Sequence, residues 1–277
     1  MTTDHDVKVH DTEFLRHGDR PLLARVYQPA GDGPFPLVVD VHGGAWTRND
    51  RTNNVDTASY LARHGIVTVS LDFRMPPEAP YPASLADINF GIRWLKAHAR
   101  EFKGTAGKVG ALGTSSGGHQ VLLAGMRPFE SRYAAIKRPE TEGFDATLAF
   151  VISGWGVLDP LHRYGMAKQQ GKTELVASHD EFWRTEAAMA EGRPMGILER
   201  GEQGKIPPAF LIQGTEEEWT SSDQVNQLAA AYRKGGGEAE VAFYEGAGHG
   251  FIRGNPQSPS SLKALGDIKT FILKHGV

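Results

Sequence analysis

Ser115 is the residue whose setting points most directly to chemistry. It is the centre of Gly-Thr-Ser-Ser-Gly at residues 113–117, a G-x-S-x-G pattern that lies between the apolar segments 109–112 and 119–124. This arrangement is typical of a sharp strand-to-helix turn, where small neighbours let the backbone bend and the serine hydroxyl stands clear of the sheet. A hydroxyl held in this way can attack a carbonyl carbon, so Ser115 is the predicted nucleophile.

A serine nucleophile needs a base that takes its proton. The sequence holds 11 histidines, and His249 is the one that lies between glycines just after the apolar segment 241–244. A loop histidine near the carboxyl end of a sheet can reach a serine at a strand-to-helix turn. His249 is therefore the predicted general base.

The reaction also needs donors for the negative oxygen that develops on the substrate. The apolar segment 37–41 leads into His-Gly-Gly-Ala-Trp at residues 42–46. Glycines lack Cβ atoms and can present backbone N–H groups to a substrate oxygen. Gly43 and Gly44, together with the N–H of Ser116 after the nucleophile, are the predicted oxyanion hole.

A third group must orient the histidine, and the residues alone leave it open. Glu216, Glu217 and Glu218 follow the apolar segment 209–212, and Asp223 stands at the start of the next helical pattern. An acid in this region would give the chain order serine, acid, histidine, which is the order expected with such a turn. It would hold the imidazole in one tautomer and stabilise its charged form.

The elements that must position these groups alternate along the chain. Short apolar runs bounded by Gly and Pro are typical of parallel strands buried on both faces, and they occur at residues 22–27, 37–41, 66–71, 109–112, 148–152, 209–212 and 241–244. Between them lie helical patterns, among them one with a predicted capping box of Ser84 and Asp87 and one at 221–234 that ends at three glycines. The fold class is therefore α/β, a mostly parallel, doubly wound sheet in a single domain spanning 1–277. About fifty residues, 157–206, are too long for an ordinary connection and are predicted to form an inserted helical cap.

Composition narrows the function. The 277 residues carry a formal charge of −3 and no run of five like charges, so nucleic acid and membrane insertion are not expected. The chain has no cysteine, which excludes disulfides and thiolate chemistry. No metal-ligand spacing or dinucleotide motif stands out, so neither metal nor other cofactor is expected. The amino terminus lacks a secretory apolar region, which predicts a cytoplasmic protein; a homodimer is left open.

Several motifs, taken in order, resemble the α/β-hydrolase superfamily, more narrowly esterases and lipases of the hormone-sensitive-lipase and acetyl-esterase type, the group that includes α/β-hydrolase-3 and BD-FAE-like proteins. Residues 42–45 resemble the oxyanion loop of that group, 72–77 with 81–83 its D-Y-R-L-A-P segment, and 113–118 its G-D-S-A-G-G motif, with Thr114 in place of the acidic residue. The resemblance implies an α/β-hydrolase fold. It also implies that the third residue after the glycine of a G-T-x-D motif is the triad acid, and counting from Gly214 this selects Glu217.

The predicted function is that of a serine hydrolase that cleaves carboxylic esters of small or medium, apolar acyl or aryl substrates through an acyl-enzyme on Ser115. Trp46 and Trp155 follow predicted strand ends and are the predicted substrate-binding residues. Four residues of the predicted cap are further candidates for an apolar lining: Tyr164, Phe182, Trp183 and Met189. Two alternatives remain. One is an amidase, because His-Gly-Gly followed by a tryptophan one residue later also occurs in arylformamidase-like sequences, and the other is a non-catalytic ligand-binding protein on a hydrolase scaffold.

Overall fold

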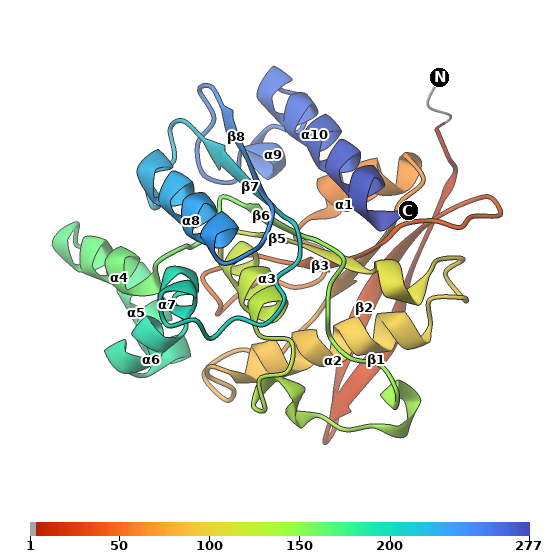
Figure 1. The fold of residues 1–277 in the computed structure, drawn as a ribbon, viewed down its shortest axis with the longest axis horizontal. Helices are drawn as coiled ribbons and strands as arrows, with labels where there is room; N and C mark the ends of the chain where they lie inside the picture. The colour runs from red at the N-terminus through yellow and green to blue at the C-terminus, as the bar shows by residue number, and fades with distance from the viewer. Residues whose placement is uncertain (1–3) are drawn as a thin grey trace.

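The protein is built around one β-sheet (Figure 1). The structure, a computed structural model, describes residues 4–277. Eight strands lie in the order β1-β2-β4-β3-β5-β6-β7-β8. Their bounds are β1 Val7–His17, β2 Arg20–Pro29, β3 Leu37–Val41, β4 Val67–Leu71, β5 Gly110–Thr114, β6 Val151–Gly154, β7 Ala209–Gly214 and β8 Ala239–Tyr244. The pairs from β4 to β8 are parallel, whereas β1 and β2 form an antiparallel edge. The predicted mostly parallel α/β sheet is confirmed.

Helices cover both faces of this sheet (Figure 1). The α-helices are α1 Val55–Arg63, α2 Ala83–Ala97, α3 Ser116–Met126, α4 Pro160–Gln169, α5 Thr173–Trp183, α6 Glu186–Glu191, α7 Pro194–Glu199, α8 Ser222–Lys234, α9 Phe251–Gly254 and α10 Pro259–Gly276, and short 3₁₀ turns lie at Ala106–Lys108, Tyr133–Ala135 and Pro139–Thr141. Because parallel strands are joined by crossovers, successive helices return over the sheet and exclude water from it.

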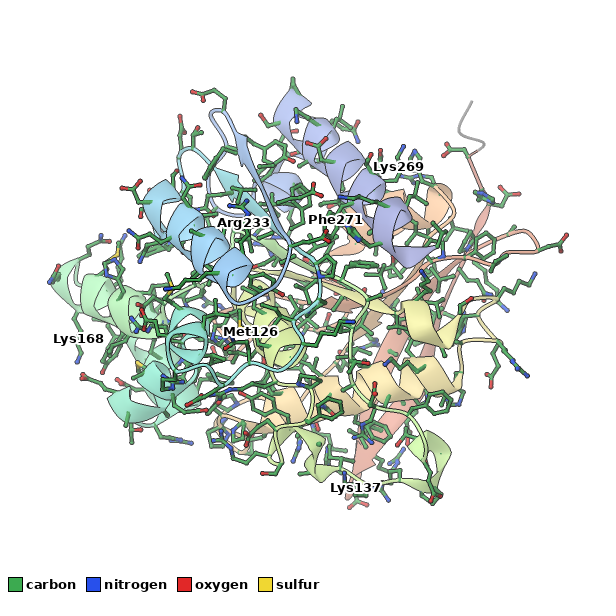
Figure 2. All side chains as sticks on the ribbon, in the orientation of Figure 1. Met126, Lys137, Lys168, Arg233, Lys269 and Phe271 are labelled. Carbon is green, nitrogen blue, oxygen red and sulfur yellow. The ribbon has the colours of Figure 1, made fainter. Side chains whose placement is uncertain are left out.

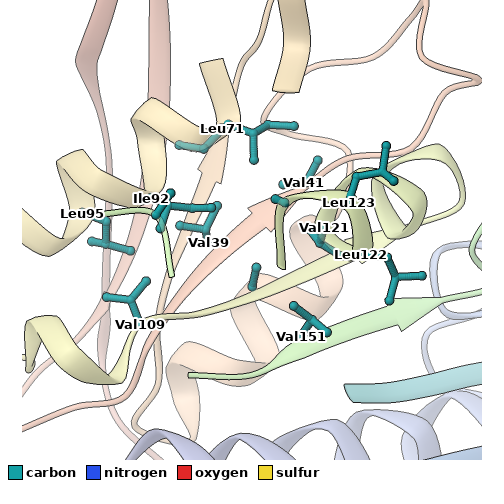
Figure 3. Close-up of a cluster of buried hydrophobic side chains, with 14 of the residues drawn as sticks. Val39, Val41, Leu71, Ile92, Leu95, Val109, Val121, Leu122, Leu123 and Val151 are labelled. Carbon is teal, nitrogen blue, oxygen red and sulfur yellow. The ribbon is translucent and has the colours of Figure 1, made fainter. Parts of the chain in front are cut away.

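The core follows from the alternation of side chains along buried strands. Val38 of β3 packs with Leu61 of α1 and Phe271 of α10 on one face. Val39, the next residue, points to the other face and packs in the cluster that includes Leu95 of α2, which Figure 3 shows. Every residue of β3 is buried, which accounts for a run that is apolar at every position but Asp40.

Two details of the sequence prediction were wrong. The strand predicted at 148–152 begins later, as β6, and the predicted capping box at Ser84 and Asp87 does not form. Ser84 lies inside α2, where its hydroxyl donates to Gln120, and Asp87 accepts from the guanidinium of Arg74. Both side chains are buried and serve tertiary contacts, so they are not available to a helix end. Strand β1 was not predicted, because most of its residues are polar and only two of them, Phe14 and Leu15, are buried.

Four helices, α4 to α7, lie between β6 and β7, the interval where the sequence predicts a helical cap. They gather at one side of the molecule, next to α3 and α8 (Figure 1). Helix α4 begins at an Asp159 cap that accepts from the N–H of His162, and α6 at a Thr185 cap that accepts from Ala188. That this segment acts as a cap stays a prediction.

None of the helices described between residues 4 and 277 is both long and apolar enough to cross a membrane.

Candidate active site

Ser115 lies between the end of β5 and the start of α3, in a backbone conformation that side chains rarely adopt. Its φ is 53° and its ψ is −121°. Close packing around the turn enforces this strain: a Cβ on Gly117 would lie 2.0 Å from the carbonyl oxygen of Val41, and one on Gly113 would lie 2.3 Å from that of Gly117. Strain of this kind persists where the surrounding structure over-determines it. The turn leaves the Ser115 hydroxyl facing a cavity at the carboxyl edge of the sheet.

Ser115, His249 and Glu217 form one hydrogen-bonded chain. His249 Nε2 lies 3.0 Å from Ser115 Oγ, and His249 Nδ1 lies 2.7 Å from Glu217 Oε2. A carboxylate oxygen can only accept, so Nδ1 carries the proton and Nε2 is free to accept from the serine hydroxyl. The second carboxylate oxygen of Glu217 accepts from the backbone N–H of Trp219 at 2.9 Å, which holds the acid in place.

Of the candidate acids in the described part of the chain, Glu217 alone is hydrogen-bonded to His249. Glu216 and Glu218 are exposed, and Asp223 lies in the first turn of α8, whose capping box is formed by Ser221 and Gln224. The side chain of Glu217, by contrast, is only 1% exposed. Burial next to His249 is what distinguishes it from its neighbours.

The predicted oxyanion residues lie against Ser115. A Cβ on Gly43 would be 3.0 Å from the Cβ of Ser115, so only a glycine permits this approach. Gly44 lines the same cavity as Ser115, with a φ of 121°. The hydroxyl of Ser116 accepts from the N–H of Trp46 at 3.1 Å, which ties the loop to the start of α3. Ala45, which the sequence reasoning did not name as a donor, also lines this cavity.

Gly44→Ala is expected to displace the backbone of this loop and with it the N–H donors of the predicted oxyanion hole. The new Cβ would lie 2.2 Å from the carbonyl oxygen of Arg48, at a φ that L-residues avoid, so the backbone must move. Displacing one donor of such a site costs on the order of 10²- to 10³-fold in kcat. The measurement is kcat for 4-nitrophenyl acetate alongside the melting temperature.

Gly266→Ala is the matched control, since a Cβ at that α10 position meets nothing within 4 Å. It should leave kcat unchanged. A folded Gly44→Ala protein with the kcat of the wild type would show that this loop does not bind the oxyanion.

A buried polar network that the sequence analysis missed holds the backbone just before the turn at Ser115. Thr114 Oγ1 donates to Asn54 Oδ1 at 3.1 Å, Asn54 Nδ2 donates to Asp40 Oδ1 at 2.8 Å, and Ser70 Oγ donates to Asp40 Oδ2 at 2.7 Å. Burial raises the pKa of Asp40 to about 6, although the hydrogen bonds from Ser70 and Asn54 act to lower it. The network joins side chains of three adjacent strands, β4, β3 and β5, and its member on β5, Thr114, directly precedes Ser115. Its signal in the sequence was an acid inside an otherwise apolar strand.

Trp46 does not line the cavity, so its prediction as a substrate-binding residue was wrong. Its side chain is 1% exposed and stacks on Phe182 of α5 at a centroid distance of 5.2 Å. The indole N–H lies 3.4 Å from Nδ1 of the buried His119, whose Nε2 lies 2.8 Å from the Gly192 carbonyl oxygen. A positive φ of 65° turns Trp46 away from the substrate side and into the helices that follow β6.

The cavity next to Ser115 has a volume of about 610 Å³, within the usual range for small-molecule sites. Trp155 lines it, whereas Tyr164, Phe182, Trp183 and Met189 pack with Trp46 in a separate cluster. Polar and apolar surface contribute about equally to the lining, which carries four cationic side chains: Arg48, Arg163, Lys172 and Arg253. The prediction of an aromatic lining drawn from the inserted helices was therefore wrong, because those aromatics fill the space between the helices and the core.

Comparison with solved structures supports the fold. A thermophilic esterase from the planctomycete Thermogutta terrifontis, Est2 with propionate bound, superimposes with a TM-score of 0.75 at 24% identity, over 99% of this chain and 96% of its own. A hyperthermophilic esterase from the archaeon Pyrobaculum calidifontis gives a TM-score of 0.78 at 20% identity, over 97% and 86%. Both agree with the predicted α/β-hydrolase fold.

Sequence relatives extend over most of the chain. Esterase LipC of Mycobacterium tuberculosis is 29% identical over 256 residues, which is 89% of this chain, and carboxylic ester hydrolase LipN of the same organism is 26% identical over 247 residues, which is 83%. The chain spans 61% of the length of each of these relatives. The profile of the BD-FAE family matches residues 25–232, about three quarters of the sequence. The chain thus belongs to the BD-FAE family.

Proposed function

We propose that this protein is a serine hydrolase that cleaves carboxylic esters of small or medium size through an acyl-enzyme on Ser115. The observation that carries the proposal is the chain of hydrogen bonds from Ser115 through His249 to Glu217, at the wall of a cavity of about 610 Å³. The names of LipC and LipN, an esterase and a carboxylic ester hydrolase, agree with it. We assign Ser115, His249 and Glu217 as nucleophile, general base and orienting acid.

The proposed reaction has two halves. Ser115 Oγ attacks the ester carbonyl carbon while His249 Nε2 takes its proton, and the carbonyl oxygen becomes negative. The tetrahedral intermediate collapses when His249 gives that proton to the departing alcohol oxygen. Water then attacks the acyl group, with His249 again taking and returning the proton, and Ser115 is released as a hydroxyl.

Most of the remaining site residues stabilise the charges that form during the reaction. We assign the N–H groups of Gly43, Gly44 and Ser116 to the oxyanion, with Ala45 as an additional donor, because preorganised dipoles need no reorientation as the charge forms. Glu217 keeps Nδ1 of His249 protonated and stabilises the imidazolium. Trp155 provides apolar surface to the bound substrate.

The preference for esters is tested against the amidase alternative. We expect the purified protein to hydrolyse 4-nitrophenyl acetate with a kcat/KM far above that for 4-nitroacetanilide, the matched amide, because the phenolate leaves readily and the amine requires full protonation by His249. The measurement is release of the nitroaromatic product for both substrates under one set of conditions. Equal values, or a larger value for the amide or for an N-formyl arylamine, would favour an amidase.

The non-catalytic alternative predicts a different outcome: no turnover of either substrate and no covalent labelling of Ser115 by a fluorophosphonate. The short contact between Ser115 and His249 argues against it, since a purely binding site has no need of a base at the serine. The cytoplasmic location and the homodimer remain predictions, for which fractionation of the source cells and light scattering are the tests.

A further inference from the structure

The cavity holds a buried arginine that the proposed reaction does not use. Arg163, on the first turns of α4, lines the cavity of Ser115 although the residue is only 3% exposed. Within residues 4–277, its Nη2 is buried and has no hydrogen-bond partner. Its Nε lies 3.4 Å from His179 Nε2, and its Cζ lies 4.8 Å from the centre of the Trp46 ring.

The carboxylates around Arg163 are engaged elsewhere. Asp159 caps α4 and pairs with Arg193, and Asp180 accepts from Tyr164. Glu217 accepts from His249, although its charge still acts on Arg163 through space. No salt bridge to Arg163 is found in the described part of the chain.

The guanidinium nevertheless stays charged at neutral pH. Burial, opposed by the charge of Glu217 and aided by that of Arg48, lowers the pKa of Arg163 to about 9. Burial also lowers the pKa of His179 to about 4, so that ring is neutral and does not balance the charge. An isolated buried charge is unfavourable unless a partner of opposite sign is supplied, and the face of Trp46 provides only part of that compensation.

We propose that Arg163 binds a carboxylate carried by the substrate, so that the cavity prefers anionic esters over neutral esters of the same shape. The guanidinium has N–H donors in a planar fork that matches a carboxylate, and here one of them, Nη2, is unpaired. The inference rests on the proposed function, and it replaces the apolar substrate expected from the sequence with one that carries a negative charge away from the ester bond.

The exposed charges at the rim of the cavity are mostly positive, which also favours an anionic substrate. Arg48, Lys172 and Arg253 line the cavity and are exposed, and Glu174 is the one exposed carboxylate among the described lining residues. Exposed charges of this kind guide an anion over a distance set by salt. The buried Arg163 contact should persist at high salt, whereas the contribution of the rim should fade.

The test compares charged and neutral esters on the wild type and on Arg163→Met, which keeps an unbranched side chain, shorter than that of arginine, and removes the charge. Mono-4-nitrophenyl adipate against its methyl ester places the carboxylate on the acyl side, and 3-acetoxybenzoate against methyl 3-acetoxybenzoate places it on the alcohol side. Loss of a charge-assisted contact is expected to lower kcat/KM for one anionic ester by about 10- to 100-fold and leave its neutral partner unchanged. The pair that responds identifies which side carries the charge.

Lys168→Met is the control on the same helix. Lys168 is exposed on α4 and lies toward the outer edge of the molecule (Figure 2), and it is not among the residues that line the cavity. It should leave both ratios unchanged. Arg163→Lys, which keeps a charge without the planar fork, should recover part of the preference for the anion.

A binding measurement separates this inference from the proposed function. Adipate, the product of the acyl-side substrate, should raise the melting temperature of the wild type but not of Arg163→Met, whereas neutral adipamide should raise neither. This result does not depend on turnover. Equal loss of activity on charged and neutral esters, together with no response to adipate, would assign Arg163 a structural role and overturn the inference.

Discussion

Ser115→Ala is expected to lower kcat for 4-nitrophenyl acetate by on the order of 10⁴-fold or more, because it removes the atom that attacks the carbonyl. A small residual rate should remain, since the oxyanion donors and the cavity still bind the substrate in position. The measurement is release of 4-nitrophenolate, with intact mass after treatment with a fluorophosphonate as a second readout. The wild type should gain one covalent adduct and Ser115→Ala none.

Ser222→Ala is the matched control for this experiment. Ser222 is an exposed serine at the start of α8, and its loss should change neither turnover nor labelling. Alanine at position 115 must adopt the same strained φ of 53°, so the melting temperature of both variants is measured alongside. Turnover and labelling that survive in a folded Ser115→Ala protein would remove Ser115 as the nucleophile.

Glu217→Gln is expected to lower kcat by a similar amount, on the order of 10⁴-fold, which is the scale of the corresponding acid-to-amide change in serine proteases. If the amide oxygen keeps its bond from the Trp219 N–H, the amide NH₂ faces Nδ1 of His249. The imidazole must then accept at Nδ1 and carry its proton on Nε2. In that tautomer it donates toward Ser115 and cannot take the serine proton.

Glu216→Gln and Glu218→Gln are the controls, and they decide between adjacent acids. Both residues are exposed, so their amide variants should keep the wild-type kcat. A large loss in either of these variants together with an active Glu217→Gln protein would reassign the acid. KM should change little in Glu217→Gln, because the substitution alters the proton transfer and not the cavity.

The arrangement around Ser115 could be predicted because it is encoded locally. The glycines at 113 and 117 permit one tight turn, and His249 follows the last strand of the sheet. Parallel strands bring such loops to one edge, which is why residues 134 positions apart in the chain meet at 3.0 Å. Glu217 required more, since three adjacent acids differ only in how the turn after β7 directs them, and the resemblance to a known family supplied that spacing.

Other features could not be predicted, because they depend on which way a side chain points. Trp46 follows a strand and two glycines, as a cavity residue would, but its backbone conformation directs it into the core. Arg163 looks like an ordinary polar residue on a helix in sequence, but in the fold it is buried against His179 of α5 and the Trp46 ring. Strand β1 pairs along a sheet edge through its backbone, so its polar side chains carry little strand signal.

The stacking of Trp46 on Phe182 limits how freely natural or designed variants can exchange parts. Trp46 and Trp183 meet edge to face with their centroids 5.5 Å apart, and Trp46 belongs to the loop that faces the nucleophile. A chimaera that takes residues 160–199 from a relative therefore replaces Phe182 and Trp183 but keeps the host's Trp46, which packs against both. Position 46 has to be transplanted with the helices, so in this protein the unit of modular exchange is discontinuous in the chain.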